Sequence, residues 1–262
     1  MLIDAHAHLD RYVDPVDRLD EALDEIETHS IFTVANAMDL PAYRRSVEIA
    51  GDCDLVLPLF GVHPWRAPQY ADRLDDLAQP AARSAMLGEV GLDHGFVKDE
   101  SQYPAQRKVL AFFLAAARDQ DKVVHLHTKG AEAEVLDLLE EYEVRRAVVH
   151  WYSGPLDLLH DFVARDIYMT VGVEVAHSDH IKAIARQVPL DLLLTETDNP
   201  GGPKGLIGDW GMPSLILDVV QDLARVRGMS RDALVEAVQA NFLRLIEDDP
   251  RLSYVRARVL QG

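Results

Sequence analysis

The segment MLIDAHAHL, residues 1–9, starts with an apolar run and ends in a His-x-His pair. Residues 2–6 are enough for a β-strand, and the period of two along a strand places His6 and His8 on the same side. Two imidazoles on one side are what two ligands of one cation require. The pair therefore predicts a metal site at the end of a first strand, although a His-x-His pair alone is as often a pair of surface residues.

Seven further strand-sized apolar runs follow the first, separated by longer stretches whose apolar residues lie three and four apart. The expected strands are 2–6, 31–36, 55–61, 85–89, 123–127, 147–151, 167–171 and 192–196. The expected helices include 16–28, 41–50, 104–120, 131–140, 156–164, 178–186 and 213–228. Strands this continuous in hydrophobic residues are typical of parallel strands covered on both faces. The alternation predicts an α/β fold, a single (β/α)8 TIM-like barrel domain over residues 1–262.

Additional C-terminal helices are expected after the eighth unit. Two patterns, 231–240 and 242–248, are helical, and Ser230 is a suitable N-cap for the first of them. Residues 201–211 are rich in Gly and Pro and are expected to form a loop at the mouth of the active site.

Composition and charge exclude several classes of protein. The chain has 262 residues, 48% of them hydrophobic, which is typical of a folded globular protein. No apolar run approaches the ~18 to 20 residues of a membrane span. A net charge of −18 disfavours broad electrostatic binding to nucleic acid or anionic lipid, so a phosphate substrate would need bound cations. The single cysteine, Cys53, and a start that lacks signal-peptide features predict a cytoplasmic protein.

Histidines and carboxylates stand at the C-terminal ends of the expected strands, where a parallel barrel builds its active site. Glu89 closes the fourth strand in GEVGLD (88–93), and Asp198 follows the eighth in ETDNP (196–200). Four imidazoles and two carboxylates would suit two divalent cations, with imidazoles favouring zinc and carboxylates admitting magnesium or manganese. The six expected ligands are His6, His8, Glu89, His127, His150 and Asp198.

Other side chains near the strand ends have both a functional and a structural interpretation. His125 and His127 both face the barrel interior, and the later residue is expected to bind metal while His125 lies in the layer beneath. His63, after the third strand, could contact substrate or pack. Bases could stack on aromatic residues of the rim, which could equally be packing residues; these are Trp65, Trp151, Tyr152 and Trp210.

Together these motifs resemble those of the TatD-type metal-dependent hydrolases and deoxyribonucleases of the amidohydrolase superfamily. The matching stretches are DAHAHL (4–9), GVHP (61–64), GEVGLD (88–93), HTK (127–129), HWYSG (150–154) and ETDNP (196–200). The resemblance implies a TIM-like barrel, the same six metal ligands, and magnesium-supported 3′ to 5′ removal of nucleotides from DNA, preferably single-stranded. Lys129 departs from the arginine common in the family and lacks the bidentate fork suited to phosphate. His125 and the Trp151-Tyr152 pair also differ from the commonest members.

The expected function is that of a divalent-metal-dependent phosphodiester hydrolase acting on single-stranded DNA ends through a metal-activated water. Glu89 would bridge two ions, and Asp198 would orient or deprotonate the water. His63 and Lys129 would contact the phosphate or the leaving oxygen, while Trp151 or Tyr152 would hold a terminal base. Two alternatives stay open: a hydrolase of amides, esters or lactones with the same site, and a noncatalytic metal-bound module of a larger assembly.

Overall fold

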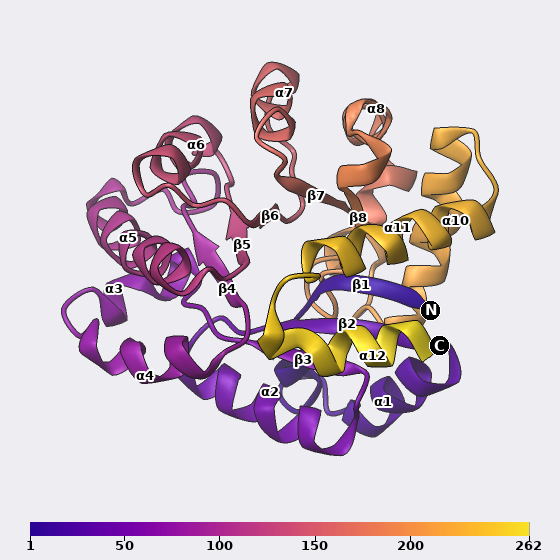
Figure 1. The fold of residues 1–262 in the computed structure, drawn as a ribbon, viewed down its shortest axis with the longest axis horizontal. Helices are drawn as coiled ribbons and strands as arrows, with labels where there is room; N and C mark the ends of the chain where they lie inside the picture. Colours follow the sequence, from indigo (N-terminus) through magenta and orange to yellow (C-terminus); the bar gives the residue numbers. More distant parts are fainter. Residues whose placement is uncertain (262) are drawn as a thin grey trace.

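The computed structural model describes residues 1–261 and contains eight strands enclosed by helices (Figure 1). All pairings between neighbouring strands are parallel, in the orders β1-β2-β3 and β4-β5-β6-β7-β8. The strands are β1 (Leu2–Ala7), β2 (Ile31–Asn36), β3 (Val56–Leu59), β4 (Leu87–Gly91), β5 (Val124–His127), β6 (Ala147–Val149), β7 (Tyr168–Val171) and β8 (Leu193–Thr195). Each of the eight predicted strands is present, most of them shorter than expected.

Two seams join the three-stranded group to the five-stranded group. At the first, Phe60 and Leu87 form a parallel bridge, and the Gly88 N–H donates to the Phe60 carbonyl at 2.9 Å. At the second, the Asp198 N–H donates to the carbonyl of His6 at 2.9 Å. The strands therefore follow one another around a ring, which confirms the predicted barrel.

Helices surround the strands (Figure 1). The helices are α1 (Leu19–Thr28), α2 (Leu40–Asp52), α3 (Ala67–Tyr70), α4 (Asp75–Arg83), α5 (Tyr103–Gln120), α6 (Glu132–Glu141), α7 (Leu156–Val163), α8 (Asp179–Gln187), α9 (Lys204–Ile207), α10 (Ile216–Arg227), α11 (Arg231–Leu245) and α12 (Ser253–Gln261). Every strand residue except the half-buried Pro58 is buried. This burial explains why the strand runs are continuously apolar rather than alternating. Among the described residues, no helix is both long and apolar enough to cross a membrane.

The C-terminal helices differ from the prediction. Ser230 caps α11 as expected, accepting from the Ala233 N–H at 3.2 Å. The separate helices 231–240 and 242–248 are wrong, because α11 runs without a break to Leu245. Asn241, at the expected break, stays helical and uses its buried side chain to bind the start of β8, donating to the Leu193 carbonyl at 2.8 Å. Helix α12 was not predicted, and neither were α3 and α4. The expected loop 201–211 contains the single turn of α9.

Helices α11 and α12 close the end of the barrel at which the strands begin; we call this end the floor. Arg146, directly before β6, donates to the Leu245 carbonyl at the end of α11 at 2.6 Å. Arg251, just before α12, donates to the Gln120 carbonyl at the end of α5 at 2.8 Å. In Figure 1 the yellow α12 is drawn in front of the strands β2 and β3. The strand ends opposite the floor form the mouth.

Candidate metal centre

The six expected ligands come together at the mouth. His6 lies in β1 and His8 just beyond it, Glu89 lies in β4, and His127 ends β5. His150 directly follows β6, and Asp198 lies three residues after β8. All six reach one point because the carboxyl ends of parallel strands meet at the same end of a barrel.

The Glu89 carboxylate is the centre of the cluster and is 1% exposed. Its Oε1 lies 2.8 Å from His150 Nε2 and 2.9 Å from His127 Nδ1. Its Oε2 lies 3.4 Å from His8 Nε2 and 3.5 Å from His6 Nε2. Asp198 approaches from the side, with its Oδ1 3.2 Å from His8 Nε2.

Three of these imidazoles have a polar neighbour on the nitrogen that points away from Glu89, and those of His8 and His127 make a hydrogen bond there. His8 Nδ1 lies 2.8 Å from the Asn36 carbonyl, so that nitrogen carries a proton and donates it. His127 Nε2 lies 3.2 Å from Asp93 Oδ2. His150 Nδ1 lies 3.5 Å from Glu196 Oε2, an ion-pair contact in which neither atom has a hydrogen-bond partner among the described residues. The outer hydrogen bonds of His8 and His127 fix the tautomer and leave the inner nitrogen of each ring free for a cation.

Several buried atoms of the cluster have no hydrogen-bond partner among the described residues, among them Glu89 Oε2 and both ring nitrogens of His6. A buried polar atom without a partner is costly, and coordination of a cation would remove that cost. Nitrogen and carboxylate donors within 4.8 Å of one another form three groups: His6, His8 and Glu89; His63, Glu89 and His127; and His6, His150 and Glu196. This donor chemistry fits divalent cations.

Electrostatics at the cluster are those of a site that exchanges protons for cations. Burial alone would raise the pKa of Glu89, but the imidazoles of His63, His150 and His6 hold it well below the usual value. Burial would lower the pKa of His8, but Asp198 and Glu89 outweigh it and raise that pKa to about 9. Protonated imidazoles thus neutralise the carboxylates in the metal-free protein, and a cation would compete with those protons.

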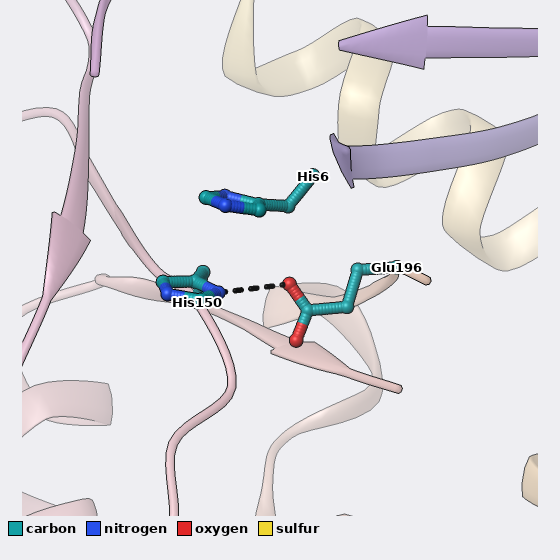
Figure 2. A group of neighbouring side chains, drawn as sticks. All are labelled: His6, His150 and Glu196. Atoms are coloured by element: carbon teal, nitrogen blue, oxygen red, sulfur yellow. Dashed lines mark ion pairs between the residues drawn. The ribbon is translucent and has the colours of Figure 1, made fainter. Parts of the chain in front are cut away.

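Asp93 and Glu196 contact metal-ligand candidates, and sequence reasoning did not assign them a role. Asp93 is fully buried, and its Oδ2 both faces His127 and accepts from the Trp65 indole N–H at 2.6 Å. Figure 2 shows Glu196 beside His150, whose ring stacks on that of His6 at 3.8 Å. Both acids lie inside motifs already singled out, GEVGLD and ETDNP, and that position was the one available signal.

A cavity of about 470 Å³ opens over the cluster and is lined by three of the four predicted substrate contacts: His63, Lys129 and Trp151. Lys129 Nζ donates to Ser153 Oγ, and the Trp151 indole donates to Glu174 Oε2 at 2.6 Å.

Two aromatic side chains of the expected site lie outside this cavity. The predicted substrate contact of Tyr152 is wrong. Its side chain is 2% exposed and packs against Phe162, and its hydroxyl donates to the Pro155 carbonyl. Tyr152 therefore cannot stack on a base. His125 is fully buried, away from the cavity, with its ring 6.4 Å from that of His6. Its position agrees with a layer beneath the expected ligands.

Comparisons with known proteins give matches along most of the chain. A family model described as TatD related DNase matches residues 3–247. The uncharacterized metal-dependent hydrolase YcfH of Escherichia coli (strain K12) is 29% identical over 97% of this chain and 99% of its own length. The human deoxyribonuclease TATDN3 is 26% identical over 97% of this chain and 96% of its own. Among solved structures, YJJV, a TatD homolog from Escherichia coli K12, is similar with a TM-score of 0.84 and 25% identity, covering 93% of this chain and 97% of that chain.

Proposed function

We propose that this chain, which belongs to the TatD-related DNase family and is a metal-dependent hydrolase, cleaves phosphodiester bonds of DNA and removes nucleotides 3′ to 5′ from single-stranded ends. One observation carries the proposal: the six expected ligands, with Glu89 at their centre, meet at the base of a cavity that also presents a lysine and aromatic rings. The name of TATDN3 supports DNA as the substrate. The direction and the preference for single strands rest on the family resemblance.

Two divalent cations, magnesium or manganese in use and zinc as a further option, would be held by the six expected ligands. When bound, they would supply Lewis-acid polarisation of the phosphoryl group and a lowered pKa for the attacking water. Glu89 would serve both ions, because its two oxygens face different histidines: Oε1 faces His127 and His150, and Oε2 faces His6 and His8.

Asp198 is assigned the role of orienting the attacking water or accepting its proton. Its carboxylate lines the cavity, and its side chain is 16% exposed, which leaves it open to substrate. Burial would raise its pKa, but His8 and its neighbours hold that pKa below the usual value. The group is therefore an anion at neutral pH and available as a base.

His63 and Lys129 are assigned to the phosphate or the leaving oxygen. Burial lowers the pKa of His63 to about 4, so its ring is neutral at pH 7 and carries one proton. His63 Nδ1 accepts from the Trp65 backbone N–H at 3.2 Å, which places the proton of the ring on Nε2, the nitrogen directed toward Glu89. The Nε2–H can thus be donated to a developing oxyanion. Lys129 supplies a point charge at the cavity wall, and Trp151 supplies a ring for a terminal base.

A labelled-substrate assay tests the proposal. Protein is incubated with 5′-labelled single-stranded DNA and magnesium or manganese, beside an EDTA control and the Asp198→Asn variant. We expect a ladder that shortens from the 3′ end, no cleavage in EDTA, and turnover about 10² to 10⁴-fold lower in Asp198→Asn. Asp209→Asn, an exposed acid of the segment after β8, is the matched control and should cleave normally.

Two results would contradict the proposal. Unchanged turnover in Asp198→Asn would remove the assigned base. Faster hydrolysis of an amide, ester or lactone than of DNA would place the reaction at carbonyl carbon instead of phosphorus.

The lone thiol, buried Cys53, supports the cytoplasm as the compartment, because a protein with one thiol fits reducing conditions.

A further inference from the structure

We propose that Trp65 and Phe96 form a stacking platform for one unpaired nucleobase of the DNA substrate, next to the metal centre. This inference rests on the proposed function and deepens it, since it assigns part of the cavity to a base rather than to the phosphate. The two residues together are called the Trp65–Phe96 platform.

Both aromatic side chains of the platform are largely exposed to solvent. Trp65 is 47% exposed and Phe96 is 65% exposed, and both line the cavity over Glu89. Their ring centroids are 6.3 Å apart and their planes meet at 88°. Single exposed hydrophobic residues are ordinary, but two adjacent aromatic residues facing a polar site are typical of a binding surface.

A buried carboxylate fixes both members of the platform. Asp93 accepts from the Trp65 indole N–H through Oδ2 at 2.6 Å and from the Phe96 backbone N–H through Oδ1 at 2.7 Å. Asp93 is fully buried, so water does not compete for these bonds. Because the indole is already held in place before binding, little conformational entropy is lost when a base stacks on it.

Charge next to the rings identifies the occupant. Lys129 Nζ lies 5.7 Å from the centre of the Phe96 ring, so a cation and an aromatic face are offered together. Although the whole chain carries −18, two cationic side chains, Lys129 and Arg11, line this cavity. Aromatic faces combined with a positive charge are how proteins bind single-stranded nucleic acid without reading its sequence.

Position relative to the metal centre fits a nucleotide. The Trp65 ring lies 4.7 Å from the ring of His63, which lies 4.7 Å from that of His127. The platform is thus one imidazole away from a metal-ligand candidate. A phosphate held at the centre would bring its attached or neighbouring base to this wall of the cavity.

The experiment removes a ring and a base separately and together. The Asp198→Asn background slows cleavage, and Kd is measured by anisotropy with manganese for a labelled oligothymidylate and for a series in which one nucleotide at a time is abasic. We expect Phe96→Ala to weaken binding of the intact oligonucleotide about tenfold. At one position of the series, removing the base should raise Kd about tenfold in the background protein. In Phe96→Ala the same removal should raise Kd no further. Trp65→Phe keeps a ring without the N–H and should lose less than Trp65→Ala.

Tyr254→Ala is the matched control, because this aromatic residue is 57% exposed but lies on α12 at the floor. It should leave Kd unchanged. Manganese affinity, measured by calorimetry, should be the same in Phe96→Ala as in the background, which separates loss of stacking from damage to the metal centre. Equal Kd values for Phe96→Ala and its background, or abasic losses that simply add to the loss from Phe96→Ala at every position, would overturn the platform. If the unmodified protein cleaves no DNA at all, the proposed function fails instead.

Discussion

The two ends of the barrel use polar side chains in opposite ways. At the floor, polar groups find backbone partners: Asn241 donates to the carbonyls of Leu190 and Leu193, and buried Lys122 donates to the carbonyls of Ala81 and Ala82. At the mouth, polar groups converge on one another, and atoms of His6 and Glu89 have no partner among the described residues. Hydrogen bonds at the floor therefore stabilise the fold, while the nitrogen and oxygen atoms at the mouth remain available to bind a ligand.

Removing the centre of the mouth should have the largest effect. We expect Glu89→Gln to lower turnover of DNA at least about 10³-fold, because an amide cannot balance five surrounding imidazoles or serve two cations. Metal content, measured by elemental analysis, should fall with it. Glu21→Gln, which changes an exposed acid paired with Arg18, is the control. Retained metal together with retained turnover would show that Glu89 is not a ligand.

At the floor, the effect should be on stability alone. Asn241→Ala removes the side-chain donor from two carbonyls near β8 and should lower the free energy of unfolding by about 2 to 3 kcal/mol. Turnover per folded molecule should stay the same. Urea unfolding followed by circular dichroism measures the change, with exposed Glu236→Ala on the same helix as control. A loss of turnover larger than the loss of folded protein would mean that the two ends are coupled.

Asp93 lies at the mouth and is not itself an expected metal ligand. It contacts one, His127, and its removal should have an intermediate effect. Asp93→Asn should weaken manganese or zinc binding about tenfold, because His127 loses a charged partner on its outer nitrogen. Calorimetric titration of the metal-free protein gives the affinity, and Trp65 emission gives a second signal, since the indole N–H bonds the same carboxylate. Unchanged affinity would restrict Asp93 to the platform.

The smallest effect should be a difference in pH dependence between the ends. The pKa of His8 is raised from 6.5 to about 9, so its contribution to stability is complete below pH 6.5 and is lost as pH rises toward 9. Burial lowers the pKa of Lys122 from 10.5 to about 8, which has the opposite sign: stability increases as pH rises from 8 to 10.5.

Melting temperatures of chelator-treated protein and of His8→Gln test the contribution of the mouth. The advantage of the parent over the variant should shrink by a few degrees between pH 6.5 and 9. With saturating manganese the stabilisation by metal should instead grow over this range, because protons and cations compete for the same nitrogens. A parent advantage that does not change with pH would contradict the assigned pKa of His8.

Sequence alone predicted the strands and the residues at their ends because both follow from local rules: apolar runs, and the meeting of parallel strand ends at one end of a barrel. Asp93 and Glu196 were not assigned because the role of a carboxylate depends on which distant imidazole it meets, His127 or His150. Tyr152 was misplaced for a related reason. Trp151, with φ of 39°, turns the chain two residues after the end of β6, and its neighbour Tyr152 enters the core against Phe162.

The expected metal ligands come from both sides of the two seams of the barrel. His6 and His8 lie in or just after β1 of the three-stranded group, whereas Glu89, His127 and His150 lie in or just after strands of the five-stranded group. A cation shared by the two sets would act as a cross-link between the halves of the barrel. The amide protons at the seams, those of Gly88 and Asp198, should then exchange with deuterium more slowly when metal is bound, while those of β6, inside one group, should change little.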